Sequence, residues 1–226
     1  YTNKIIELSD SHHSFLLPKE DDERKITLEG GDIMVVSNNH ILVGVSERTS
    51  SEAAVKITQT LFEMKLMDKV TIVKIPKKRD YMHIDTVFTQ VKKDVWVMLG
   101  NFSRKAVKHE DESAVERILE IKKEEKIKIL QFNRNNPENP ISFESLEDLL
   151  VDISKTDLNC TGEVRFIFSG NNEFPYSARE QWTDSCNLLA LKEGVVLGYD
   201  RNDKTTEAFR NAGFTIIGVK ELLQQL

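Results

Sequence analysis

The stretch DIMVVSNNHILVGV, residues 32–45, decides the fold of this chain. Two apolar runs, at 33–36 and 41–45, flank the polar segment Ser-Asn-Asn-His. Apolar runs of this length on either side of a short polar turn are typical of paired β-strands. The stretch therefore predicts a β-hairpin whose strands are buried.

The residues after this hairpin predict a helix and a third strand. The polar segment 46–51 carries serine and threonine hydroxyls that can cap a helix. Apolar side chains then recur at helical spacing at Ala54, Ile57, Leu61 and Met64. A further apolar run at 70–75 ends before a proline. Residues 26–76 therefore predict the order strand, strand, helix, strand.

A second unit with this order is predicted over residues 84–169, in a longer and less regular form. Its strands are expected at 86–91, 95–100 and 164–168, and its helix at 142–155. Residues 104–141 are highly charged and are interpreted as an insertion into this unit. Within the insertion we expect a helix at 111–125, a strand at 128–132 and an Asn/Pro loop at 133–140.

The third unit is compact and is predicted over residues 184–219. Its strands are expected at 187–191, 195–199 and 214–219, with a short helix before the glycine at 213. Three copies of one supersecondary unit favour a radially repeated α/β architecture, in which equivalent positions meet around a common axis. We treat residues 1–226 as a single domain built from these units.

Polar side chains stand where each unit enters its first strand: Glu29 to Asp32, His83 to Asp85, and Asp184 to Asn187. Residues two apart in an extended segment point to the same side, so His83 and Asp85 can face one site. Because equivalent positions of the units meet at the axis, we expect the three groups to converge. Several carboxylates beside one histidine suit a cationic, planar hydrogen-bond donor such as a guanidinium group.

An arginine follows the second strand of each unit, at Arg48, Arg104 and Arg201. In these positions an arginine can meet a carboxylate at the other end of a substrate. Some of these residues can also have a purely structural role. Gly30-Gly31 can be a backbone turn that requires positive φ, and Arg201 fits an internal salt bridge equally well.

The composition excludes several classes of partner. With a net charge of -6 and a pI of about 5.5, the chain lacks the basic surface that nucleic acids and anionic membranes require. Two cysteines, Cys160 and Cys186, do not make a disulfide framework, so we expect a reduced, cytoplasmic setting. We interpret both cysteines as packing or loop residues, and we expect neither a metal nor a cofactor. Assembly into a homo-oligomer stays open.

Five motifs together resemble arginine deiminases, within the guanidino-group-modifying superfamily that has the five-bladed α/β propeller, or pentein, fold. They are Leu28–Asp32, Gly44–Ser50, Met82–Phe88, Arg179–Asp184 and Gly198–Asn202. The resemblance covers about residues 26–100 and 173–219. It implies a pentein propeller built from strand-strand-helix-strand repeats, about three of the five being present here.

The resemblance implies hydrolysis of L-arginine to L-citrulline and ammonia through a covalent thio-uronium intermediate on a cysteine. His83 would be the general acid and base, Glu29 would orient it, and Asp85 would hold the guanidinium nitrogens. Arg48 would bind the substrate carboxylate, and Asp32 would also contact the substrate.

Two parts of the family pattern do not match this chain. The family's nucleophile lies in a Gly-rich loop near the C-terminus, and a second guanidinium-binding aspartate belongs upstream. We therefore expect the nucleophile to lie outside these residues and the chain alone to be inactive. An amidinotransferase of the same fold and a non-catalytic pentein binding protein stay open as alternatives.

Overall fold

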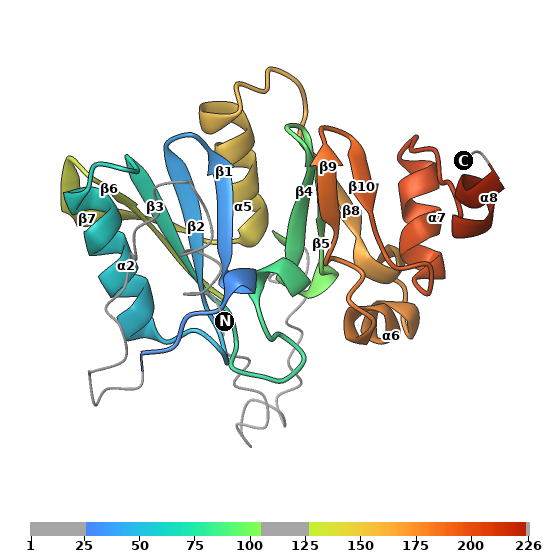
Figure 1. Cartoon of the computed structure of the whole chain (residues 1–226), viewed down its shortest axis with the longest axis horizontal. Coiled ribbons are helices and arrows are strands. Elements are labelled where there is room, and N and C mark those ends of the chain that lie inside the picture. The colour runs from blue at the N-terminus through green and yellow to red at the C-terminus, as the bar shows by residue number, and fades with distance from the viewer. Residues whose placement is uncertain (1–25, 105–126, 225–226) are drawn as a thin grey trace, which may run out of the picture.

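The computed structural model describes residues 26–104 and 127–224 (Figure 1). The largest sheet has five strands, in the order β1 (Ile33–Ser37), β2 (His40–Val45), β3 (Lys69–Lys74), β6 (Lys128–Asn133) and β7 (Asn136–Phe143). A second sheet joins β4 (Phe88–Lys92), β5 (Val95–Met98) and β8 (Arg165–Phe168). A third pairs β9 (Leu189–Lys192) with β10 (Val195–Leu197). The helices are α2 (Ser51–Glu63), α5 (Leu146–Asp152), α6 (Tyr176–Trp182), α7 (Asp203–Asn211) and α8 (Val219–Gln224).

The first unit has the predicted order, and its elements are confirmed. Strands β1 and β2 form the antiparallel hairpin, and α2 leads into β3, which runs parallel to β2. Ser50 is the N-cap of α2, where its side chain accepts a hydrogen bond from the backbone N–H of Ala53 at 3.2 Å. A serine in this position satisfies one of the unpaired amides of the first helical turn.

Strand β2 is buried on both faces, and this makes it the centre of the large sheet. Ile41, Val43 and Val45 pack with the apolar face of α2. Leu42 points to the opposite face and joins the main core, to which β4, β5 and α5 contribute. Because side chains alternate along a strand, one uninterrupted apolar run supplies both cores.

The insertion extends the first unit's sheet. Strand β6 pairs antiparallel with β3, and β7 pairs antiparallel with β6 (Figure 1). The strand predicted at 128–132 is confirmed, but the loop predicted at 133–140 is wrong. Its prolines lie in β7, the edge strand, where a missing backbone N–H is tolerated. The helix predicted at 111–125 lies outside the described residues.

The second unit has its own helix, although with different bounds from those predicted. Helix α5 begins after the N-cap Ser145 and continues as a π-helical turn, Ile153–Asp157, in place of one helix over 142–155. Strand β8 then pairs parallel with β5. The indole N–H of Trp96 in β5 donates to the hydroxyl of Ser154 at 2.9 Å, which fixes the π-helical turn against the sheet.

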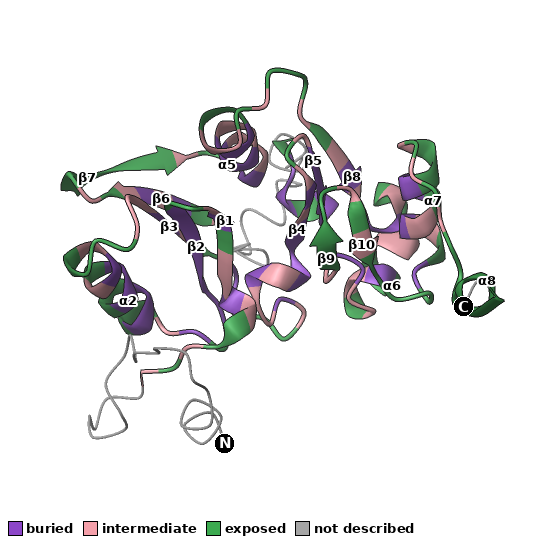
Figure 2. Cartoon of the chain, turned by 45° about the horizontal axis from the view of Figure 1, so that its top comes forward, coloured by how far each residue is buried: buried purple, intermediate pink, exposed green. Residues whose placement is uncertain are grey.

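In the third unit, the hairpin and α7 are present, but the predicted third strand is wrong. Residues 214–218 form no strand, and α8 begins at Val219. Strand β9 is exposed along its whole length (Figure 2). An apolar run forms a strand only where another strand can pair with it. In the described chain no strand pairs with residues 214–218. The mixed α/β class is confirmed.

Candidate functional site

Two equivalent 3-10 turns build the site. The first, Gly30–Asp32, precedes β1, and the second, Ile84–Thr86, precedes β4. The residue before each turn is extended, and these two residues are Glu29 and His83. Nε2 of His83 lies 2.7 Å from Oε2 of Glu29. The equivalence of the two units therefore places a carboxylate and an imidazole in direct contact.

Asp85 completes the cluster from inside the second turn. Its Oδ1 lies 3.7 Å from Nδ1 of His83, so the imidazole stands between two carboxylates. The sequence placed His83 and Asp85 in an extended strand, but a turn brings them together. Burial raises the pKa of Asp85, the charge of His83 opposes this, and the charges of Asp32 and Asp184 add to the rise.

The Oδ1 atom of Asp85 is buried and has no hydrogen-bond partner among the described residues. A buried acceptor without a partner is costly, and a bound donor would remove that cost. A guanidinium nitrogen is such a donor, and its charge would also stabilise the carboxylate form.

Asp32 has a different environment from the other acidic residues. It is fully buried, and its carboxylate accepts hydrogen bonds from the hydroxyl of Ser46 at 2.6 Å and from the backbone N–H of Ile84 at 3.0 Å. The second contact joins the first 3-10 turn to the second. A Cβ at Gly44 would lie 2.1 Å from Oδ1 of Asp32, so the glycine in β2 makes room for this carboxylate.

The three arginines that follow the second strands have different surroundings. Arg48 is exposed, and its guanidinium has no ion-pair partner in the described part of the chain. Arg104 pairs with Glu147 and Asp148 at the start of α5. Arg201 lies against the backbone of Thr183, 3.3 Å from its carbonyl oxygen. Among the described residues, Arg48 is therefore the one of these three arginines without a charged or backbone partner for its guanidinium, and it is the candidate to meet a ligand.

A cleft of about 780 Å³ runs from Asp85 along the first strands of the three units. Its walls come from β1, β4 and β9 and include Met34, Thr89, Gln90, Asn187 and Leu189. Of the residues at the three strand entrances, Asp85 and Asn187 line this cleft, and the first unit contributes Met34 and Val35 of β1.

The cysteines of the described chain have no features of a nucleophile. Cys186 is fully buried in the main core, and this burial raises the pKa of its thiol to about 12. Its interpretation as a packing residue is confirmed. Cys160 is partly exposed, and its sulfur lies 3.7 Å from the carbonyl oxygen of Gly162. Neither thiol contacts His83.

Gly31 is needed for space, and the interpretation of Gly30-Gly31 as a positive-φ turn is wrong, since neither residue has positive φ. A Cβ at Gly31 would lie 2.7 Å from the His83 ring and 2.9 Å from Oδ2 of Asp85. Such close approach of side chains to the backbone is a common reason for glycine before a strand.

Gly31→Ala is therefore expected to destabilise the fold by about 1 to 3 kcal/mol, the usual cost of overpacking. Gly30→Ala is the matched control, because a Cβ there would have nothing within 4 Å. Urea denaturation of both variants gives the comparison. Equal stability of the two would show that the turns do not pack as described.

Residues 26–104 and 127–224 contain no helix that is both long and apolar enough to cross a bilayer. The same residues contain no group of three or more His, Cys, Asp or Glu side chains arranged to hold a metal ion.

The geometry thus defines a mixed α/β protein with a carboxylate–imidazole cluster suited to a guanidinium group. The family model for arginine deiminase matches residues 9–222, and the chain belongs to this family. Arginine deiminases from Staphylococcus aureus strains JH9 and Newman are 34% identical to it over 195 residues. These residues are 85% of this chain and 42% of each relative, so the chain spans less than half of their length.

Two solved structures are also similar to the chain. A DDAH mutant from Pseudomonas aeruginosa in complex with citrulline has a TM-score of 0.45 and 17% identity, and the match covers 88% of this chain and 52% of that one. An amidinotransferase from Microseira wollei, from the saxitoxin biosynthetic pathway, has a TM-score of 0.49 and 14% identity over 92% and 48% of the two chains.

The sequence does not indicate how three neighbouring residues support the cluster. Ser46 donates a hydrogen bond to Asp32, and Gly44 leaves space for its carboxylate. Gly31 leaves space for the ring of His83. One available signal was a glycine inside an apolar strand, at position 44, because such glycines often mark close approach of other groups. The contact of Ser46 with Asp32 has no comparable signal, because a serine after a strand also fits an ordinary turn.

Proposed function

We propose that this chain carries the guanidinium-binding part of a hydrolase that converts L-arginine to L-citrulline and ammonia. The observation that supports this most directly is the Glu29–His83–Asp85 cluster, with 2.7 Å between the first two side chains. Membership of the arginine deiminase family supports the same substrate class.

In the proposed reaction, His83 moves the protons. A cysteine thiolate outside these residues attacks the guanidinium carbon, and the C–N bond breaks as His83 donates a proton to the departing ammonia. Water then loses a proton to His83 and attacks the same carbon, which breaks the C–S bond and releases citrulline. Hydrogen bonding to Glu29 orients the imidazole for both steps.

The remaining residues bind the substrate or hold the site. Asp85, whose Oδ1 has no hydrogen-bond partner among the described residues, accepts hydrogen bonds from the guanidinium nitrogens. The exposed side chain of Arg48 binds the substrate carboxylate. Because Asp32 is enclosed by Ser46 and Ile84, we assign it to positioning of the two turns in place of the substrate contact that the resemblance implied.

We also propose that the described units belong to a five-bladed propeller. The strand orders β1-β2-β3 and β4-β5-β8 are the same, and both place a parallel third strand beside the hairpin. The third unit has only its hairpin and α7. Its exposed sheet and the open cleft are compatible with further blades that close the ring.

A binding role without catalysis is the second candidate. It is favoured by the state of the thiols in the described residues, since Cys186 is buried with a pKa of about 12. The thiolate is the reactive form, and it is scarce when the pKa lies far above neutral pH. Both candidates require the same guanidinium site, and they differ in whether turnover occurs.

The 226-residue chain alone is expected to produce no citrulline from L-arginine, because the described part offers no reactive thiolate beside His83. A longer family protein containing these residues should release ammonia and citrulline. The assay measures citrulline with the chain alone, with Cys186→Ser and with the longer protein. Turnover by the chain that Cys186→Ser abolishes would contradict the proposed position of the nucleophile, and no turnover by the longer protein would favour the binding role.

A further inference from the structure

The turn at residues 183–187, here called the third-unit turn, is fixed against the second unit. The hydroxyl of Thr89 in β4 donates to the carbonyl oxygen of Cys186 at 2.6 Å, and this contact is buried. The hydroxyls of Ser185 and Ser169 lie 2.6 Å apart, also buried. These contacts place Asp184 at the end of β4 that carries Asp85.

Asp184 has an uncommon backbone conformation. Its φ is +55°, in the left-handed region that residues with a side chain adopt in only a small percentage of cases. Aspartate and asparagine tolerate this region better than most residues do. A glycine would fit without strain, so the need for a turn does not by itself explain a carboxylate here. Residues held in this region are often found at functional sites.

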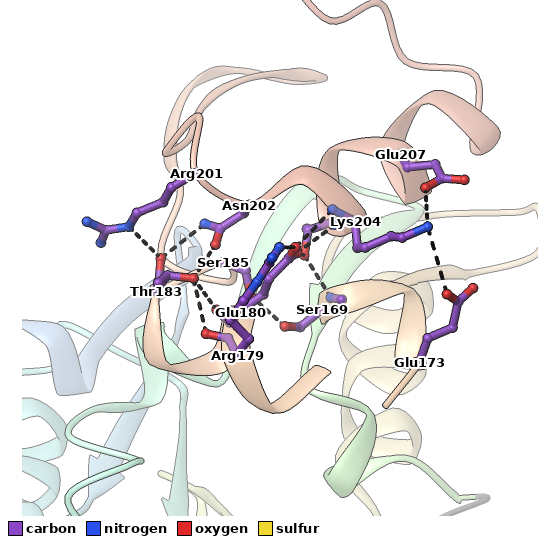
Figure 3. A network of polar contacts seen from close by, with 12 residues as sticks. Ser169, Glu173, Arg179, Glu180, Thr183, Ser185, Arg201, Asn202, Lys204 and Glu207 are labelled. Atoms are coloured by element: carbon purple, nitrogen blue, oxygen red, sulfur yellow. Dashed lines mark hydrogen bonds and ion pairs between the residues drawn. The ribbon is translucent and has the colours of Figure 1, made fainter. Parts of the chain in front are cut away.

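Arg201 holds the third-unit turn from outside (Figure 3). Its Nε donates to the carbonyl oxygen of Thr183 at 3.3 Å. Its Nη2 lies 3.5 Å from Oδ2 of Asp184. The guanidinium also lies over the ring of Tyr199, 4.3 Å from its centroid. The side chains of Arg201 and Asp184 are 50% and 33% exposed, so water screens the ion pair between them. Arg201 therefore offsets the negative charge of Asp184 only in part.

Asp85 is faced by charged groups from all three units. His83 lies beside it and contacts Glu29 through its other nitrogen, and Asp32 accepts a hydrogen bond from the backbone N–H of the neighbouring Ile84. Asp184 belongs to the third-unit turn, which the hydrogen bond from Thr89 to Cys186 holds against β4. The charge of Asp184 is among the causes that raise the pKa of Asp85, after burial and the charge of Asp32. The third-unit turn thus acts on the group proposed to receive the guanidinium.

We propose that Asp184 is a positioning residue that increases the negative potential at Asp85, and that Arg201 limits this effect by pairing with Asp184. The inference rests on the proposed function in one respect, since the potential serves to attract a guanidinium cation. Two like charges near a site favour a cationic ligand over a neutral one, and a partial counter-charge adjusts the strength of that preference.

The test is a carbon-13 NMR titration of the Asp85 carboxyl in the 226-residue chain without ligand. In Asp184→Asn the pKa of Asp85 should fall, because a negative charge is removed while the asparagine still fits the left-handed conformation. In Arg201→Gln it should rise, because Asp184 loses its counter-charge. Asp184→Gly controls for the backbone and should reproduce Asp184→Asn. If the pKa of Asp85 were unchanged in both Asp184→Asn and Arg201→Gln, the proposal would be overturned.

A second measurement separates this inference from the proposed function. L-arginine should bind Asp184→Asn about two- to fivefold more weakly than the unmodified chain, the range for a screened charge interaction. Equal affinities would overturn the positioning role. If the unmodified chain does not bind L-arginine but the pKa of Asp85 still responds to Asp184, the proposed function fails while the charge coupling stands.

Discussion

Asp157→Asn is expected to destabilise the fold by about 3 to 5 kcal/mol, because it removes a buried carboxylate that the buried His40 and the partly exposed Lys69 both contact. Nδ1 of His40 lies 2.9 Å from Oδ2 of Asp157, and Lys69 pairs with the other oxygen. Nε2 of His40 lies 2.8 Å from the hydroxyl of Thr71. The side chains of His40 and Asp157 are 0% and 3% exposed, so water cannot replace the lost contacts.

The effect of this substitution should depend on pH in a defined direction. Burial by itself would raise the pKa of Asp157, but the hydrogen bonds and charges of His40 and Lys69 outweigh it and hold the pKa below its usual range. A depressed carboxyl pKa contributes stability above the unfolded pKa of about 4, and the contribution is lost as the pH falls through the folded pKa. The difference in free energy of unfolding between Asp157→Asn and the unmodified chain should therefore be largest at neutral pH and become smaller below about pH 4.

Asp148→Asn is the matched control. Asp148 also has a lowered pKa and an arginine partner, Arg104, but that partner is half exposed and the pair lies on the surface. We expect a loss of about 1 kcal/mol or less in urea denaturation at neutral pH. Equal losses for the two substitutions would show that burial of the His40–Asp157 contact is not what stabilises the fold.

His83→Ala is expected to lower kcat by about a hundred- to ten-thousandfold in a longer family protein containing these residues, the usual range for loss of a general acid and base. Arg48→Ala should instead raise KM for L-arginine about tenfold with a small change in kcat, since it removes a charge-assisted contact with the substrate carboxylate. Steady-state kinetics of both variants separates the two roles.

Agmatine, which lacks the carboxylate, tests the role of Arg48 further. Arg48→Ala should leave the KM for agmatine nearly unchanged, because agmatine has no carboxylate for Arg48 to bind. If agmatine were the better substrate of the unmodified protein, the role of Arg48 would be wrong. Retention of kcat in His83→Ala would remove His83 from the proton transfers.

The sequence predicted the first unit well because its signals are local. An apolar period, a capping serine and a run ending at Pro76 are all contained within residues 26–76. The elements that were predicted wrongly depend on partners. The prolines of β7 indicated a loop because the sequence does not show that this strand lies at a sheet edge. The run at 214–219 has strand character, but nothing in the described chain pairs with it.

The sequence predicted which residues form the cluster but only part of its geometry. Glu29, His83 and Asp85 come together as expected, but two 3-10 turns achieve this in place of extended strands. The contact between His40 and Asp157 joins residues 117 positions apart. No pattern of neighbours indicates such a pair, because each residue alone reads as a polar group beside a strand or at a helix end.

The most direct test of the proposed guanidinium site is an NMR titration of the 226-residue chain with L-arginine that follows the imidazole signals of its histidines. His83 lies in the site and His40 is buried outside it, so His40 is an internal control. We expect a saturable shift of the His83 signals, no shift for His40, and loss of the response in Asp85→Asn. Saturable binding that leaves His83 unaffected, or no binding at all, would contradict it.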